Sequence, residues 1–288
     1  MKKLFKIAVN FMAVALMTVA TFGLAACEDI KKLELSLNLY NYTDNAFYAE
    51  NDVKFSVDLY RHLAPKTVDA VLEHVKNGYY NGAIFYEQGG IIMMGDLKID
   101  ESGNVVQNLI ENKLPSQIYG EFEYGGTKGS DLVNKKGSIG IWRSYYANDT
   151  ETYKTSSNAR DSGRATWYIP TSEKTDYNGY FCIFAQYDTA DTANAKAIEA
   201  ITAIFSNADY YTEYIIYYTG TSEDYSVDKA DENYGLTFHA VKKADFDEDA
   251  EVFEAEGQQL VCFNKKTVKI PNVVGGEVSA KVKSVKVK

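Results

Sequence analysis

Val53-Lys54-Phe55-Ser56-Val57-Asp58-Leu59-Tyr60 is the stretch that decides the fold, because apolar and polar side chains alternate along it without a break. This period of two predicts a half-buried β-strand. Pro65 follows in Ala64-Pro65-Lys66-Thr67, where it suits the first turn of a helix. The spacing i, i+3, i+4, i+7 of an amphipathic helix then appears at Val68, Val71, Leu72 and Val75. Asn77-Gly78 predicts the end of this helix.

Further short apolar segments, separated by turn residues, continue downstream. Those with the length and composition of β-strands are 83–85, 91–94, 137–142, 166–169, 180–185 and 280–288. The segment 33–40 also alternates and is predicted to be a strand or an extended arm. A second helix is expected over 191–205, with Ile198, Ile201 and Ile204 on one side. Many short strands with two amphipathic helices predict a mainly β domain.

The N-terminus has the three parts of a secretory signal: a basic start, an uncharged run over 7–23, and small residues before Cys27. Its ending, Leu24-Ala25-Ala26-Cys27, resembles the lipobox of bacterial lipoproteins, in which the cysteine sulfur receives a diacylglycerol. A membrane-spanning anchor, or an ordinary signal with a chance cysteine, is the alternative. We expect a signal peptide over 1–26 and a lipid anchor, tether and N-terminal extension over 27–52. The protein would then lie on the extracytoplasmic face of a bacterial membrane.

Charge and cysteine content limit the classes of function. The net charge is −10, and removing residues 1–26 with their three lysines leaves −13. This acidity argues against nucleic-acid binding and against electrostatic adhesion to anionic lipid. Besides Cys27, the chain has Cys182 and Cys262, which could form a disulfide in an oxidising compartment or, for Cys182, be a buried thiol.

The order of these segments resembles the cyclophilin-type peptidyl-prolyl isomerases. The likeness is strongest over 53–97, where the strand and helix quoted above are followed by Gly78-Tyr79-Tyr80-Asn81-Gly82-Ala83-Ile84-Phe85. Beyond residue 97 the matching segments keep the same order as far as residue 205, and the likeness returns in the closing strand at 280–288. The resemblance implies a closed eight-stranded antiparallel β-barrel capped by two α-helices. The cyclophilin-like domain would span 53–288, with long loops and an insertion at about 206–270.

The resemblance implies catalysis of rotation about X–Pro bonds, which takes roughly tens to hundreds of seconds without a catalyst. The family holds the proline carbonyl with an arginine two residues past a strand phenylalanine, which here is Phe85. Glu87 occupies that place, and a carboxylate accepts hydrogen bonds instead of donating them. Losing one preorganised donor costs about 10²–10³ in rate. Catalysis is therefore expected to be weak or absent, unless Arg143 or Arg164 substitutes.

Other positions also depart from the family pattern. Tyr86 stands at the place of a histidine, and Trp142 stands at the place of a small alanine, where it could fill a pocket meant for peptide. Met94 and Thr166 replace two glutamines. An apolar wall is partly kept, although its members could equally be barrel core. The expected peptide-binding residues are Phe85, Tyr86, Ile92, Met94, Trp142, Thr166, Tyr168, Tyr177 and Phe181.

Three functions remain open. The first is a membrane-tethered isomerase-like protein that acts on or binds X–Pro segments of exported proteins. The second is a non-catalytic peptide- or protein-binding module of the cell envelope, and a third option is a structural domain whose groove Trp142 plugs. No cofactor or metal is expected. The three histidines lack a paired spacing, and the acidic run 245–256 lacks the glycine of a calcium loop.

Overall fold

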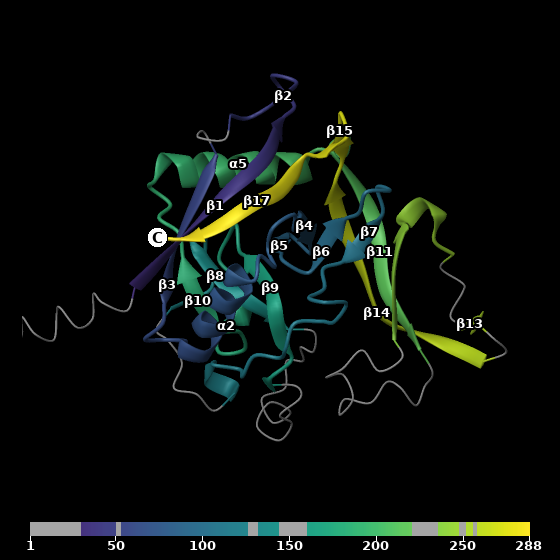
Figure 1. Cartoon of the computed structure of the whole chain (residues 1–288), viewed down its shortest axis with the longest axis horizontal. Helices are drawn as coiled ribbons and strands as arrows, with labels where there is room; N and C mark the ends of the chain where they lie inside the picture. The colour runs from purple at the N-terminus through teal and green to yellow at the C-terminus, as the bar shows by residue number, and fades with distance from the viewer. Residues whose placement is uncertain are drawn as a thin grey trace, which may run out of the picture.

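The computed structural model describes residues 30–49, 53–125, 132–143, 160–220, 236–247, 252–255 and 258–288 (Figure 1). Eight strands form a barrel: β1 (Ile30–Asn41), β3 (Lys54–Tyr60), β4 (Phe85–Gln88), β5 (Ile91–Met94), β8 (Ser138–Arg143), β9 (Gly163–Ile169), β10 (Ile183–Gln186) and β17 (Ala280–Val287). They follow the order β4-β5-β9-β8-β10-β3-β1-β17, and each strand is antiparallel to its neighbours.

The segment just before β4 closes the barrel. The backbone N–H of Gly82 donates to the carbonyl of Val282, and the N–H of Val282 donates to the carbonyl of Ala83, both at 2.8 Å. An antiparallel bridge between Ile84 and Lys281 continues this pairing. β17 therefore has a partner on each side, which confirms the closed eight-stranded antiparallel barrel.

Two α-helices, α2 (Pro65–Lys76) and α5 (Thr192–Ser206), cover opposite ends of the barrel (Figure 1). Asp191 caps α5 by accepting the N–H groups of Ala193 and Asn194, both at 2.9 Å. For α2 the cap comes from a distant residue, because the Glu121 carboxylate accepts the Thr67 N–H at 2.7 Å. Each helix turns apolar residues into the barrel core, which confirms both predicted helices. These are Val68 and Val71 on α2, and Ala197, Ile198, Ile201 and Ile204 on α5.

β1 is an integral part of the barrel. It pairs with β3 along one edge and with β17 along the other. Leu33, Leu35, Leu37 and Leu39 are each at most 1% exposed, because alternate side chains of a strand point to the same face. The segment 33–40, predicted as a strand or an arm, is thus a strand that the barrel needs.

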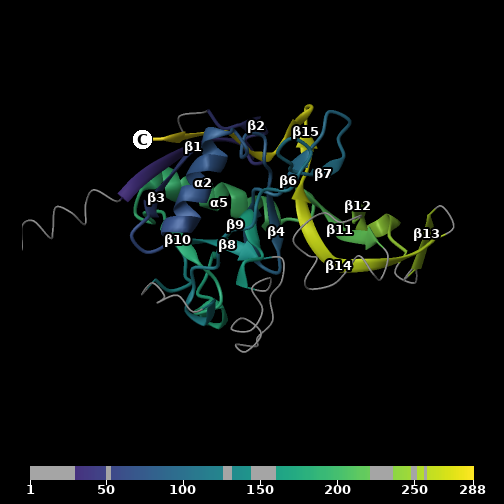
Figure 2. The same cartoon turned by 60° about the horizontal axis from the view of Figure 1, so that its bottom comes forward.

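A second sheet leaves the barrel beside β4. We call it the lateral sheet; its strands are β11 (Tyr211–Gly220), β12 (Thr237–Lys242), β13 (Val252–Ala255) and β14 (Gln258–Pro271). It falls within the predicted insertion of about 206–270. β14 joins it to the barrel through the pairing of Lys269 with Glu87. Figure 2 shows the lateral sheet projecting to the right of the barrel.

Short elements complete the described chain. Three hairpin pairings involve β2 (Ala46–Phe47) with β1, β6 (Leu97–Ile99) with β7 (Val105–Gln107), and β15 (Val273–Val274) with β16 (Glu277–Val278). Single 3₁₀ turns occur at η2 (Glu123–Gly125), η3 (Thr175–Tyr177) and η4 (Lys243–Asp245).

Candidate functional site

The predicted site residues on β4, β5 and β9 divide between the two faces of the barrel wall. Phe85, Ile92 and Met94 point inward and are at most 2% exposed in the main core. Tyr86 and Tyr168 belong to a separate apolar cluster on the outer face. Phe85, Ile92 and Met94 therefore lie in the barrel core, apart from the outer face where Tyr86 and Tyr168 lie.

A row of paired residues crosses this outer face. Tyr86 pairs with Met93, Met93 with Tyr168, and Tyr168 with Gly140. Gly140 is needed here because a Cβ atom at that position would lie 2.3 Å from two ring carbons of Tyr168. The Tyr168 hydroxyl then reaches Asn134, to which it donates a hydrogen bond of 2.5 Å.

Four rings beside this row form what we call the outer aromatic cluster: Trp142, Tyr168, Tyr177 and Phe181. Trp142 stacks on Phe181 with a centroid separation of 5.1 Å and an interplanar angle of 21°. Its indole also lies 6.1 Å from the Tyr168 ring and 6.0 Å from the Tyr177 ring. The structure thus brings together four of the predicted peptide-binding residues, and Trp142 packs against the other three rings, which also contact one another.

Glu87 lies away from this cluster. It is on the side of β4 that carries Phe85, it forms an ion pair with Lys269 of β14, and it accepts the Gly90 N–H at 2.6 Å. The Lys269 ammonium also approaches the carbonyl of Phe205 at the end of α5, at 3.4 Å. Glu87 therefore secures the junction between barrel and lateral sheet.

The two arginines considered as substitutes both have structural contacts. Arg143 is 3% exposed, and its guanidinium lies over the Phe122 ring at 4.0 Å and the Phe181 ring at 5.2 Å. Arg164 donates to the carbonyl of Pro115. Arg143 therefore packs beside Phe181 of the outer aromatic cluster, and Arg164 binds the backbone at Pro115.

The lateral sheet covers the outer face next to the cluster. Ile216 of β11 and Val268 and Ile270 of β14 pack in the same apolar cluster as Tyr86 and Met93. A cavity of about 50 Å³ remains between the two sheets. Its lining joins barrel and lateral-sheet residues: Tyr86, Gln88, Asp96, Leu97, Gln107, Trp142, Ile216, Tyr218, Phe238 and Lys266.

Polar groups at this cavity are paired, both within the barrel wall and across to the lateral sheet. The Tyr86 hydroxyl donates to Asp96 at 2.9 Å, and Gln107 donates to the Tyr218 hydroxyl at 2.8 Å. Burial raises the pKa of Asp96, although the Tyr86 hydrogen bond and the nearby Lys266 charge oppose this. Burial also lowers the pKa of Lys266, against the attraction of Asp96. Thr166 donates toward Asp96 as well, which places this predicted residue at the same cavity.

Sequence reasoning missed Asp96, Tyr218 and Lys266. The alternation of Val268 and Ile270 in β14 was a signal that this strand has one buried face. Nothing in the pattern says that this face packs on β4 and β5, because the contact joins residues more than a hundred positions apart.

The remaining predictions concern the N-terminal signal, a membrane span, a metal site and the cysteines. The signal segment 1–26 and Cys27 lie outside the described residues and stay predictions. Where the structure describes the chain, no helix is long and apolar enough to cross a membrane, and no three His, Cys, Asp or Glu side chains gather as metal ligands. Cys182 and Cys262 are not joined, and burial raises the pKa of the Cys182 thiol to about 12.

Comparison with known proteins gives a family match. The family model described as cyclophilin type peptidyl-prolyl cis-trans isomerase/CLD matches residues 47–204. A cyclophilin type peptidyl-prolyl cis-trans isomerase of Cryptosporidium parvum has 17% sequence identity, with 58% of this chain and 84% of that chain covered and a TM-score of 0.33. A second structure of that protein, in the presence of the dipeptide Ala-Pro, gives the same identity and coverage with a TM-score of 0.32. No curated protein matches the sequence.

Proposed function

Because the chain belongs to the cyclophilin-type peptidyl-prolyl cis-trans isomerase family, we propose that it is a membrane-tethered, extracytoplasmic member with a degraded catalytic site. It binds proline-containing segments of exported proteins at the outer aromatic cluster. It isomerises them weakly or not at all.

The packing of Trp142 carries the proposal for the catalytic site. Its indole packs against Tyr168, Tyr177 and Phe181, so a pyrrolidine ring cannot take that position without displacing it. Charge supports the same conclusion, because Glu87 is paired with Lys269 and offers no donor. Catalysis needs a donor aimed at the substrate carbonyl, and Glu87, which stands at the position of the family's arginine, supplies none.

Binding can persist without catalysis. Trp142, Tyr177 and Tyr180 are partly exposed, and proline-rich segments dock on aromatic surfaces in several recognition domains. Stacking on such rings needs no cation. The cluster would therefore hold proline on its surface, where the family would enclose it in a pocket.

The tether rests on the N-terminal sequence. A basic start, an uncharged run and Leu24-Ala25-Ala26-Cys27 together favour lipid attachment at Cys27. Two acyl chains give stable anchoring where one does not, since each buried CH₂ contributes about 0.8 kcal/mol. The export that this signal implies would place the binding face among extracytoplasmic proteins.

Tryptophan fluorescence tests the binding. The chain has two tryptophans, and Trp167 is fully buried inside the barrel. In a Trp167→Phe variant of residues 28–288, Trp142 alone would report a proline peptide at the cluster. We expect a saturable change with Ala-Ala-Pro-Phe peptides and none with Ala-Ala-Ala-Phe peptides. Equal responses to both peptides, or no response, would remove the cluster as the binding face.

A further inference from the structure

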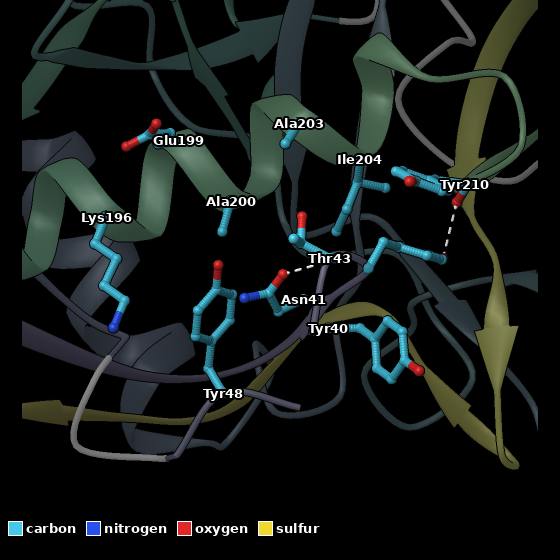
Figure 3. A pocket seen from close by; sticks show the side chains of 11 residues that line it. Tyr40, Asn41, Thr43, Tyr48, Lys196, Glu199, Ala200, Ala203, Ile204 and Tyr210 are labelled. Carbon is cyan, nitrogen blue, oxygen red and sulfur yellow. Dashed lines mark hydrogen bonds between the residues drawn. The ribbon is translucent and has the colours of Figure 1, made fainter. Parts of the chain in front are cut away.

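A second pocket lies away from the outer aromatic cluster, between α5 and the turn that follows β1. Its volume is about 230 Å³. Four tyrosines line it, at positions 40, 42, 48 and 210. None of the elements that build this pocket contributes a residue to the outer aromatic cluster. Figure 3 shows Tyr48 on one side, Tyr210 on the other, and Ala200 and Ile204 of α5 between them.

Three of the rings, those of Tyr40, Tyr42 and Tyr210, are held in place by contacts among themselves. Tyr42 stacks on Tyr210 at a centroid separation of 3.7 Å and an angle of 7°, and its hydroxyl donates to the Tyr210 carbonyl. Tyr40 meets Tyr42 edge-on at 4.9 Å. All four tyrosines remain partly exposed. The pocket is therefore a preformed aromatic wall that solvent and ligands can reach.

A cation already lies in this pocket. The ammonium of Lys196 sits over the Tyr48 ring, 5.0 Å from its centroid (Figure 3). Electron-rich ring faces attract ammonium groups, and a cage of several aromatic rings is the usual receptor for quaternary ammonium ligands. Lys196 thus shows where a cation is held.

Negative charge surrounds the pocket, as a site for a cation requires. Burial raises the pKa of the Tyr48 hydroxyl, and the neighbouring Asp44 and Glu199 carboxylates raise it further. Glu199 also lines the pocket. The chain as a whole carries −10, which draws cations toward it.

We propose that this tyrosine pocket binds an alkylammonium group, and that the side chain of Lys196 is a built-in competitor for the same place. The volume lies below the roughly 300–1,000 Å³ of sites for drug-sized molecules, so a single head group or side chain fits better than a large ligand. The group could belong to choline or to a lysine side chain of another protein.

Titration calorimetry on the full chain in a non-ionic detergent tests this. The probes are choline, its uncharged isostere 3,3-dimethylbutan-1-ol, and Nα-acetyl-lysine amide. We expect a cationic probe to bind at least about tenfold more tightly than the uncharged isostere, as one partly desolvated cation–π contact implies. Tighter binding of choline would indicate a lipid or choline source, and tighter binding of the lysine derivative a protein source.

Two variants test whether Tyr48 favours binding of the cationic probe and whether Lys196 opposes it. Tyr48→Leu should weaken binding about tenfold. Lys196→Gln should strengthen it, because the competing ammonium is gone. Lys265→Gln is the matched control, since Lys265 lies over the Phe246 ring at 5.5 Å outside the pocket. It should leave the affinity unchanged.

The opposite results would overturn the proposal. These are equal affinity for choline and its uncharged isostere, no binding of either cation, or weaker binding by Lys196→Gln. The last outcome would mean that the Lys196 side chain helps to form the pocket and does not compete for it. Because Lys196 and Lys265 are exposed surface residues, their variants keep the test valid even if Tyr48→Leu fails to fold.

Discussion

Single residues decide how the outer face is built. Gly140 leaves room for the Tyr168 ring, which lies across it and reaches Asn134. Tyr86 and Asp96 pair under the lateral sheet, and Glu87 pairs with Lys269 at its junction with the barrel. These positions serve packing and charge balance, although sequence resemblance places Glu87 at a catalytic position.

Gly140→Ala tests the close approach of the Tyr168 ring to the backbone at residue 140. The new Cβ would lie 2.3 Å from the Tyr168 ring, so the free energy of unfolding should fall by about 1–3 kcal/mol, the usual cost of overpacking. Denaturant unfolding measures it. In a Tyr168→Leu background the same substitution should cost clearly less, because the clashing ring is absent. Equal costs in both backgrounds would mean that Gly140 serves another purpose.

Asp96 makes stability depend on pH. Its pKa in the folded protein is raised above the ordinary 3.8, mainly by burial. As the pH rises from about 4, the unfolded chain loses this proton before the folded chain does, so the carboxyl group lowers stability across that window. Asp96→Asn removes the effect. The stability of the variant minus that of the wild type should therefore grow between about pH 4 and pH 7, and a shrinking difference would contradict the assignment.

Among the strands, β17 is the one that closes the barrel. It pairs with β1 on one side and closes the barrel against residues 82–84 on the other. Its absence would leave two unpaired edges and open the core.

Val282→Asp tests this role without truncating the chain. Val282 is 0% exposed, and an unpaired buried charge at this position should abolish cooperative melting of the whole barrel. Val287→Asp is the matched control on the same strand. Val287 is 49% exposed, so its substitution should change stability by no more than about 0.5 kcal/mol. Circular dichroism melts that are alike for the two variants would disprove the closing role.

Sequence alone predicted the barrel strands and both helices, but not the strands of the lateral sheet or the face on which each site residue lies. The alternation in 53–60 and the helical spacing of Val68 and Val71 are local signals, and both elements are where they were expected. β4 has only four residues, so its faces follow from pairing with β5 and β14, which no local pattern records. The Tyr-rich region 208–258 had no dominant period, and its docking on the barrel depends on long-range contacts.

At the scale of the whole molecule, the fold combines a barrel with a lateral sheet that covers part of its outer face. This covering leaves the outer aromatic cluster at the edge of the contact, with Trp142 lining the cavity between the sheets. The proposed lipid anchor would hold this proposed binding face at a membrane surface.

Cys27→Ser tests the anchor. If the Cys27 sulfur carries the lipid, the variant should leave the membrane fraction or remain unprocessed at residue 26, as fractionation and N-terminal analysis would detect. A Cys262→Ser variant, which changes a cysteine within the lateral sheet, should fractionate as the wild type does. Membrane retention and processing of the Cys27 variant equal to the wild type would rule out lipidation at this residue.

We propose that this cyclophilin-type barrel has kept its fold and lost efficient catalysis. The most direct measurement is the rate of X–Pro isomerisation by residues 28–288 in a protease-coupled assay, with a catalytically competent cyclophilin as the positive control. We predict a rate within about twofold of the uncatalysed reaction, because Glu87 is paired with Lys269 and Trp142 packs against the other rings of the outer aromatic cluster. A large rate enhancement by the native protein would contradict this prediction, and its persistence in the Glu87→Ala variant would show that another residue supplies the donor.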